Sequence, residues 1–132
     1  MSKVELTIPG PIPSKKNSKQ IITVRGRPII ISSKKYLAWN KMARGSVRIQ
    51  TVWHKLQRVE DIRLITIKFY WPDKRRRDLS NIAEGVMDLL VETKIIQDDC
   101  WKFVPKLVLI SSGIDKVKPR AEVEIDDQSD NN

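Results

Sequence analysis

The chain contains only one cysteine and one histidine among its 132 residues. A single cysteine excludes an internal disulfide, and one cysteine with one histidine is too few for a zinc site, which takes three or four such ligands. Any metal ion must therefore be bound through oxygen. Aromatic residues are also few, at 6% of the chain, and they show no regular spacing of the kind found in base-stacking platforms.

Long apolar runs are missing as well. No stretch approaches the roughly 18 residues that a membrane-spanning helix requires. The N-terminal residues do not combine a charged start with an apolar segment, as a secretory signal peptide does. We therefore expect a cytoplasmic protein that has no membrane partner and no organic cofactor.

Positive charge dominates what is present. The chain has 25 Lys and Arg against 16 Asp and Glu, a formal net charge of +9. The charge is unevenly placed, because residues 1–77 hold 19 cations against 4 anions (+15) and residues 78–132 hold 6 against 12 (−6). Such a field attracts polyanions, which makes nucleic acid the leading partner class. With 40% hydrophobic residues the chain can bury the core of one small domain.

Hydrophobic periodicity predicts an α+β domain with a mixed sheet and two main helices. Strands are expected near residues 4–8, 20–24, 28–32, 62–71, 103–110 and 121–125. The second and third of these form a β-hairpin with the basic tip Arg25-Gly26-Arg27, and the strand at 62–71 is central. Helical spacing covers residues 34–57, with Ser32 or Ser33 as N-cap and a weak point at Gly45, and residues 81–93, with Ser80 as N-cap. We assign residues 1–125 to one domain and residues 126–132 to a polar acidic tail.

A cluster of carboxylates directly follows a run of four cations, Lys74 to Arg77. It comprises Asp78, Glu84, Asp88, Glu92, Asp98 and Asp99. A strand end, a helix face and a turn carry these residues, so three elements could bring carboxylates to one place. Magnesium takes one or two carboxylates completed by water and phosphate oxygens, which suits phosphodiester hydrolysis. The alternative is a solvated helix face followed by a polar turn, as charge runs often are.

The stretch from Arg75 to Asp99 resembles the signature of the RusA-like Holliday junction resolvases. The matching segments are Asp78-Leu79-Ser80-Asn81, Val86-Met87-Asp88-Leu89-Leu90 and Lys94-Ile95-Ile96-Gln97-Asp98-Asp99. That family has Asp-x-Asp-Asn, a helix ending in Asp-x-Leu, and a hydrophobic pair before Asp-Asp. The proline-rich, lysine-bearing loop from Ile8 to Asn17 is similar too. The resemblance implies a homodimer that binds four-way DNA junctions in recombination and repair. With Mg²⁺, or Mn²⁺ as substitute, it makes paired nicks, in a bacterial or phage-infected cell.

The resemblance also implies roles for single residues. Asp78 matches the first metal-binding aspartate and Asp99 completes the catalytic site, while Asp98 and Asp88 match accompanying acidic positions. Ser80 stands where the family has a second aspartate, and Glu84 stands where it has a lysine linked to catalysis. Because Glu84 lies one turn into the helix, it could reach back and keep the carboxylate count, so we include it among the metal and catalytic residues. The alternative is that Ser80 only caps the helix and Glu84 is surface, leaving a weak or inactive site.

The basic residues are expected to contact DNA through its backbone and shape. Lys15, Lys16, Lys19 and Arg75, Arg76, Arg77 are the assigned contacts, and Arg25, Arg27, Lys34 and Lys35 add to the basic surface. A second function class stays open, a junction-binding or DNA-binding module that does not cut and whose acidic site is vestigial. We expect His54 to be a packing or surface residue, Cys100 a core residue, and the four tryptophans core or subunit-interface anchors.

Overall fold

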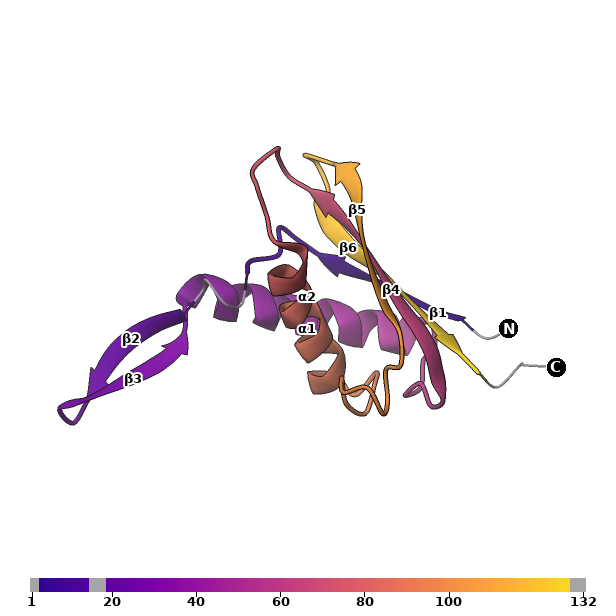
Figure 1. The fold of residues 1–132 in the computed structure, drawn as a ribbon, viewed down its shortest axis with the longest axis horizontal. Coiled ribbons are helices and arrows are strands. Elements are labelled where there is room, and N and C mark those ends of the chain that lie inside the picture. The colour runs from indigo at the N-terminus through magenta and orange to yellow at the C-terminus, as the bar shows by residue number, and fades with distance from the viewer. Residues whose placement is uncertain (1–2, 15–18, 129–132) are drawn as a thin grey trace.

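The structure, a computed structural model, describes residues 3–14 and 19–128. Its elements in chain order are β1 (Lys3–Pro9), β2 (Lys19–Val24), β3 (Arg27–Ser32), α1 (Lys34–Trp53), β4 (Ile62–Trp71), α2 (Leu79–Glu92), β5 (Leu107–Ile114) and β6 (Arg120–Asp127) (Figure 1). The predicted α+β domain with two main helices is confirmed. Among the described residues, no helix is both long and apolar enough to cross a membrane.

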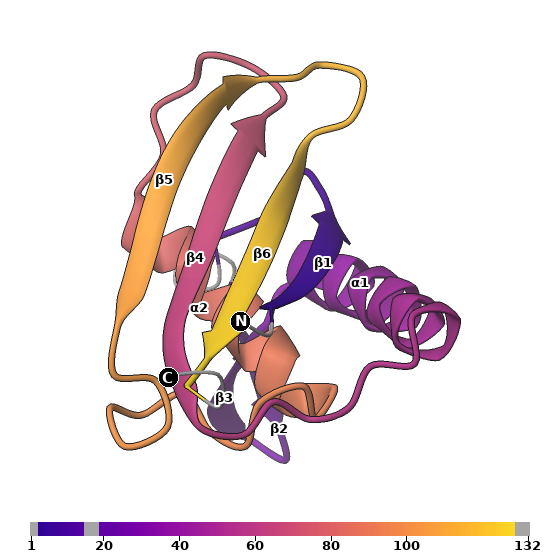
Figure 2. The same cartoon turned by 90° about the vertical axis from the view of Figure 1, so that its right-hand side faces the viewer.

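The main sheet has four strands in the order β1-β6-β4-β5 (Figure 2). It is mixed, because β6 pairs antiparallel with both β1 and β4, whereas β4 and β5 run parallel. The strand β4 therefore lies in the interior of the sheet, as its β-branched composition predicts. Its Ile65, Ile67 and Phe69 are fully buried on the face that the two helices cover, and the intervening Lys68 lies on the opposite face.

The two helices cross at a glycine. A Cβ atom on Gly85 of α2 would lie 3.3 Å from a ring carbon of Tyr36 and 3.6 Å from one of Trp39, both on α1. The absence of a side chain thus lets two buried aromatic rings pack directly on α2. Ser33 caps α1 by accepting a hydrogen bond from the backbone N of Tyr36, as predicted. The helix continues through Gly45 without a break, so one long helix forms instead of two short ones.

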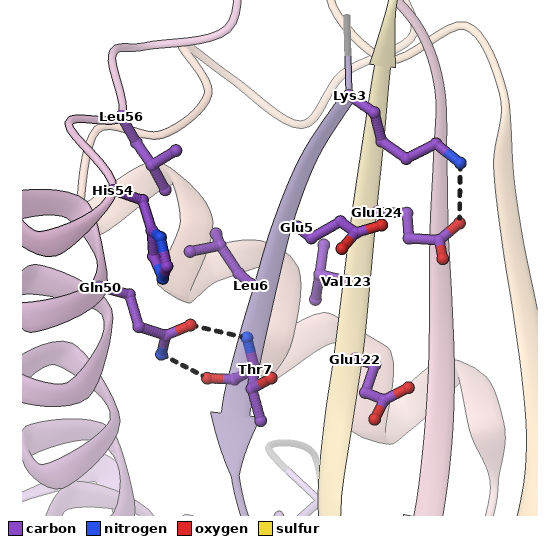
Figure 3. A pocket seen from close by; sticks show the side chains of 10 residues that line it. All are labelled: Lys3, Glu5, Leu6, Thr7, Gln50, His54, Leu56, Glu122, Val123 and Glu124. Carbon is purple, nitrogen blue, oxygen red and sulfur yellow. Dashed lines mark hydrogen bonds and ion pairs between the residues drawn. The ribbon is translucent and has the colours of Figure 1, made fainter.

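The amide of Gln50, near the end of α1, holds the edge strand β1. Its Oε1 accepts from the backbone N of Thr7 at 2.8 Å, and its Nε2 donates to the carbonyl of Thr7 at 2.6 Å (Figure 3). One side chain thus satisfies both outward-facing backbone groups of that residue. This contact fixes the position of α1 against the sheet.

Two parts of the chain differ from the prediction after α2. The strand β5 begins at Leu107, later than expected, because residues 100–104 form a turn in which the backbone N atoms of Phe103 and Val104 donate to the Cys100 carbonyl. Cys100 is exposed, so its assignment to the core is wrong. Trp101 is 80% exposed and Trp53 79%, which excludes both from the core, while Trp39 is buried.

The last strand extends past the predicted domain boundary. β6 runs through Asp127, and the nearly buried Asp126 forms an ion pair with Arg63 of β4 at 3.1 Å. Gln128 then donates through its side chain to the carbonyl of Ile62 and through its backbone to that of Asp61. The first residues of the predicted tail are therefore part of the sheet.

Shortening the chain at its C-terminus should show which of the last residues stabilise the sheet. A chain that ends at Ile125 is expected to lose about 1–3 kcal/mol of unfolding free energy, because the Asp126–Arg63 pair and the Gln128 hydrogen bonds are removed. A chain that ends at Gln128 should match the full-length protein. Urea denaturation of the two truncated chains measures the difference, and equal midpoints would show that residues 126–128 do not contribute to the fold.

Candidate functional site

Asp78 occupies the N-cap position of α2, which corrects the prediction that Ser80 is the cap. Its Oδ1 accepts hydrogen bonds from the backbone N of Ser80 at 3.1 Å, the Ser80 hydroxyl at 2.8 Å and the backbone N of Asn81 at 3.4 Å. Its Oδ2 accepts from Nδ2 of Asn81 at 3.3 Å. The carboxylate is therefore held in one orientation at the positive end of the helix while its hydrogen-bonding groups stay accessible to solvent.

A basic pocket of about 250 Å³ opens beside this carboxylate. It is lined by Pro11, Ile12, Pro13, Ser14, Lys35, Arg75, Arg76, Arg77, Asp78 and Ile82. The N-terminal proline loop, the first turn of α1 and the segment before α2 thus meet here. Four cations and a helix N-terminus around one hollow make a site for an anion, and arginine suits phosphate because its guanidinium donates two parallel hydrogen bonds.

The three arginines of this segment do different things. Arg77 donates to the Asp73 carboxylate at 2.7 Å and lies 5.3 Å from the centre of the Trp71 ring. The hydrogen bonds from the Arg75 backbone N and the Arg77 side chain lower the pKa of Asp73. Arg77 therefore stabilises the conformation of the connection between β4 and α2. The side chain of Arg75 is 85% exposed and forms only a long ion pair with Asp73 at 3.8 Å, and Arg76 is exposed too, so the guanidinium groups of these two arginines are accessible from solvent.

A second acidic group lies further along α2. The pKa of Asp99 is raised, first by partial removal from water, then by the negative charge of Asp88 and by a hydrogen bond with Asp98. Asp88 is ten residues beyond Asp78, which corresponds to about 15 Å along a helix axis. Glu84 is exposed on the helix between them. The predicted carboxylates thus form two groups, Asp78 with its cap partners, and Asp88 with Asp98 and Asp99.

The carboxylates of these two groups can provide some, but not all, of the oxygen ligands that a bound cation needs. In the portion of the chain that the structure describes, no three His, Cys, Asp or Glu side chains are arranged to hold one metal ion. Magnesium, however, needs only one or two carboxylates when water and phosphate oxygens complete its shell. The pKa of Asp99 is raised first by partial burial and only then by the charge of Asp88, and a divalent cation bound nearby would favour the charged form of this carboxylate. The residues therefore suit magnesium bound together with phosphate, and do not suit a site closed by protein ligands alone.

Some expected contacts lie elsewhere. Lys15 and Lys16 fall outside the described residues, and Lys19 begins β2. Sequence reasoning treated Lys35 as general basic surface, whereas it lines the pocket. It also missed Asp73 and Trp71 as the groups that hold Arg77. An Asp that precedes a run of arginines by two residues is the only signal that could have indicated this role.

The grouping of Asp99 with Asp88 can be tested by titration. Because the Asp88 charge raises the pKa of Asp99, the substitution Asp88→Asn should lower that pKa in the metal-free protein. Carboxyl-carbon NMR follows the titration directly. Glu84→Gln serves as the control and should leave it unchanged. An unaltered titration of Asp99 in Asp88→Asn would show that the charge of Asp88 does not act on Asp99.

The relation between Ser80 and Glu84 gives another prediction. If Glu84 supplies the carboxylate that Ser80 lacks, Glu84→Gln should cost as much nicking activity as Asp78→Asn, and adding Ser80→Asp should restore a measurable part. The Ser80 hydroxyl already donates to Asp78, so an aspartate there would place a second carboxylate beside the first. Nicking at limiting magnesium is the measurement. Unchanged rates in Glu84→Gln would assign that residue to the helix surface.

A small basic α+β domain with a fixed carboxylate beside an arginine-lined pocket suits a protein that binds the phosphates of nucleic acid. The family described as endodeoxyribonuclease RusA matches residues 9–126, which is most of the chain. The protein therefore belongs to the RusA endodeoxyribonuclease family, as the resemblance of its acidic segments predicts. No curated protein matches the chain significantly.

Proposed function

We propose that this protein is a magnesium-dependent endonuclease that resolves Holliday junctions by paired nicks in opposing strands. The observation that carries the proposal is the pocket that Lys35, Arg75 and Arg76 line together with the oriented carboxylate of Asp78. In a member of an endodeoxyribonuclease family, this arrangement suits a DNA phosphate at the point of cleavage.

The residues of the chain have separate tasks in this proposal. Lys35, Arg75 and Arg76 bind the phosphate and offset the charge that develops on it. Ser80 and Asn81 hold the Asp78 carboxylate, and Arg77 with Asp73 keeps the loop in shape. Because Asp78 lies apart from Asp88, Asp98 and Asp99 within one copy, a magnesium ion would be held either at Asp78 or at Asp99, and in the second case Asp98 and Asp88 would be the accompanying oxygen donors. Glu84, exposed on the helix between the two groups, is the remaining candidate donor. The magnesium ion would supply Lewis acidity and an activated water molecule, and manganese should substitute for it.

The substrate argues for two copies. A four-way junction has two-fold symmetry and its resolution needs two symmetric cuts, so a homodimer with one site per copy is the simplest match. We place the reaction in the cytoplasm of a bacterial or phage-infected cell, as part of DNA recombination and repair.

A second candidate is a junction-binding protein that does not cut. It is favoured by the serine that replaces the second aspartate of the motif and by the lack of a three-residue metal cluster in the described residues. Both candidates bind DNA in a salt-dependent way. Only cleavage separates them.

The test uses a labelled synthetic four-way junction with magnesium, with manganese and with EDTA. A linear duplex of the same sequence is the control. We expect symmetric nicks in opposing strands of the junction with either metal, none with EDTA and little cutting of the duplex. Tight junction binding without nicks under every condition would favour the non-cutting protein.

A further inference from the structure

A second pocket shares the arginine segment with the pocket beside Asp78. It has a volume of about 540 Å³ and lies where the connection between β4 and α2 passes the end of the edge strand β5 (Figure 2). We call it the β5 pocket. Arg75, Arg76 and Arg77 line both pockets, so a molecule that extends from one into the other has the same cations beside it throughout.

The β5 pocket combines these cations with apolar side chains. Trp71, Leu79 and Ile114 line it, and Ile114 is 45% exposed although it is a large aliphatic residue. A hollow of a few hundred Å³ with apolar surface and a few polar groups is the usual form of a site for a small organic group.

The indole of Trp71 is held in a fixed position. Its ring stacks on the buried Phe69, with the ring centres 5.1 Å apart and the planes 4° from parallel. Its Nε1 donates to the Ser111 hydroxyl at 2.7 Å, and Arg77 lies 5.3 Å from the ring centre. The side chain is only half-buried, so part of the ring remains accessible. Because the ring is already ordered, a ligand that contacts it loses little affinity to ordering.

The strand β5 adds polar groups to the pocket. Ser111 accepts a hydrogen bond from Trp71, which leaves its own hydroxyl proton to donate to a ligand. As an edge strand of the described sheet, β5 also has backbone N–H and C=O groups without a strand partner. The register between β4 and β5 shifts at this point, so Ser112 forms a β-bulge with no partner in β4.

Gly113 leaves space beside these groups. It lines the β5 pocket, and its φ of 137° is one that residues with a side chain rarely adopt. A Cβ at this position would meet no atom within 4 Å. The backbone of β5 is therefore open to close approach by a ligand.

We propose that the β5 pocket binds one unpaired nucleobase of the DNA strand whose phosphate lies in the pocket beside Asp78. The base lies against Trp71 and Ile114, and its polar edge meets the Ser111 hydroxyl and the backbone of β5. Unpaired bases are recognised in this way, by contact with aromatic side chains and by hydrogen bonds to their edges.

The charges of the lining residues favour this occupant. Lys74 and the three arginines stand against one carboxylate, Asp73, which Arg77 already binds at 2.7 Å. The surroundings of the pocket therefore attract an anionic chain, while its apolar surface suits a flat uncharged ring. A nucleotide has both parts, and the shared arginines place its phosphate and its base in adjacent pockets.

This role of the β5 pocket rests on the proposed function and adds a means of sensing a branch. Taking a base out of a continuous duplex is unfavourable, and it is least so where pairing is already disturbed. A branch point is such a place. Binding of the base there would bring the neighbouring phosphate to Asp78 more readily than in an unbranched duplex.

Removal of single bases tests the pocket without cleavage. A synthetic four-way junction carries one abasic residue at each position around the branch point in turn, and fluorescence anisotropy in EDTA measures its affinity for the full chain. We expect the loss of one particular base to weaken binding about fivefold or more, the lower end of what one stacked base contributes. Equal affinity for all the abasic junctions would overturn the proposal.

Filling the pocket tests which residues contact that base. Ile114→Trp should bind the intact junction and the sensitive abasic junction equally, because the base can no longer enter. Ile110→Trp is the matched control, since Ile110 lies in the same strand, is 38% exposed and does not line the pocket. It should keep the full difference between the two junctions, and circular dichroism checks that both variants fold. A full difference in Ile114→Trp would place the base elsewhere and overturn the proposal.

Photo-cross-linking locates the base directly. Iodouracil at the sensitive position should cross-link to Trp71, as mass spectrometry of the digested complex would show. Trp53 and Trp101 are internal controls, because they are 79% and 80% exposed and neither lines the pocket. Cross-links to either of them in place of Trp71 would overturn the proposal. A protein that shows the expected base dependence and never nicks DNA would contradict only the proposed function.

Discussion

Asp78→Asn and Asp99→Asn should each reduce nicking of a four-way junction by about two to three orders of magnitude, the scale on which single preorganised electrostatic groups contribute. Each change removes one charged oxygen donor but keeps the size of the side chain. In Asp78→Asn, the amide oxygen of the new side chain can still accept a hydrogen bond at the helix cap, so the fold should survive. The measurement is single-turnover nicking in magnesium.

Junction binding should remain in both variants, or become tighter. The reason is that each substitution removes a negative charge that faces phosphate. A gel shift in EDTA measures binding without cleavage, and Glu60→Gln, on an exposed loop, is a charge-matched control. Full nicking by either aspartate variant would remove that residue from the site.

Arg75→Ala combined with Arg76→Ala should weaken DNA binding at moderate salt and flatten the plot of log affinity against log salt by about 0.9 for each phosphate that is no longer neutralised. The effect is expected from these two because both are exposed beside the pocket, whereas Arg77 is held by Asp73 and Trp71. Binding titrations over a range of salt concentrations give the slope.

The control for this pair removes the same charge elsewhere. Arg58→Ala with Lys68→Ala takes two cations from the α1–β4 connection and from the sheet face opposite to the helices. It should lower affinity only through net charge and leave the slope nearly unchanged. Equal slopes in the two double variants would mean that DNA docks away from the arginine segment.

Periodicity and turn chemistry were enough to predict most elements of this fold. The hairpin was predictable because the Arg25-Gly26 turn needs positive φ at both residues and glycine supplies one of them, and the structure has φ values of 51° and 77° there. The late start of β5 was not predictable. Phe103 and Val104 suit a strand as well as a turn, and only the hydrogen bonds to Cys100 decide between them.

The candidate site was predictable in its parts and not in its arrangement. Sequence spacing identifies Asp78 and Asp99, but it does not show that Asp78 caps α2 or that Asp99 lies beside Asp88. Of the three adjacent arginines, only Arg77 is held by contacts with both Asp73 and Trp71. These contacts depend on the folded arrangement, so no local sequence pattern predicts which arginine makes them. Exposure of Trp53 and Trp101 is likewise a tertiary outcome.

The pairing of β1 with β6 has a consequence for how the chain folds. β6 lies between β1 and β4, and its partners in β1 precede it by more than a hundred residues, as in Leu6 opposite Val123. The hairpin and helices can form from local contacts, but β1 has no neighbour in the sheet until residues 120–127 are available. During synthesis, β1 therefore stays without its partner in the sheet until the last strand has been made. Contacts between residues so far apart in the sequence form slowly, because closing a long loop costs chain entropy. Completion of the sheet should therefore limit the folding rate.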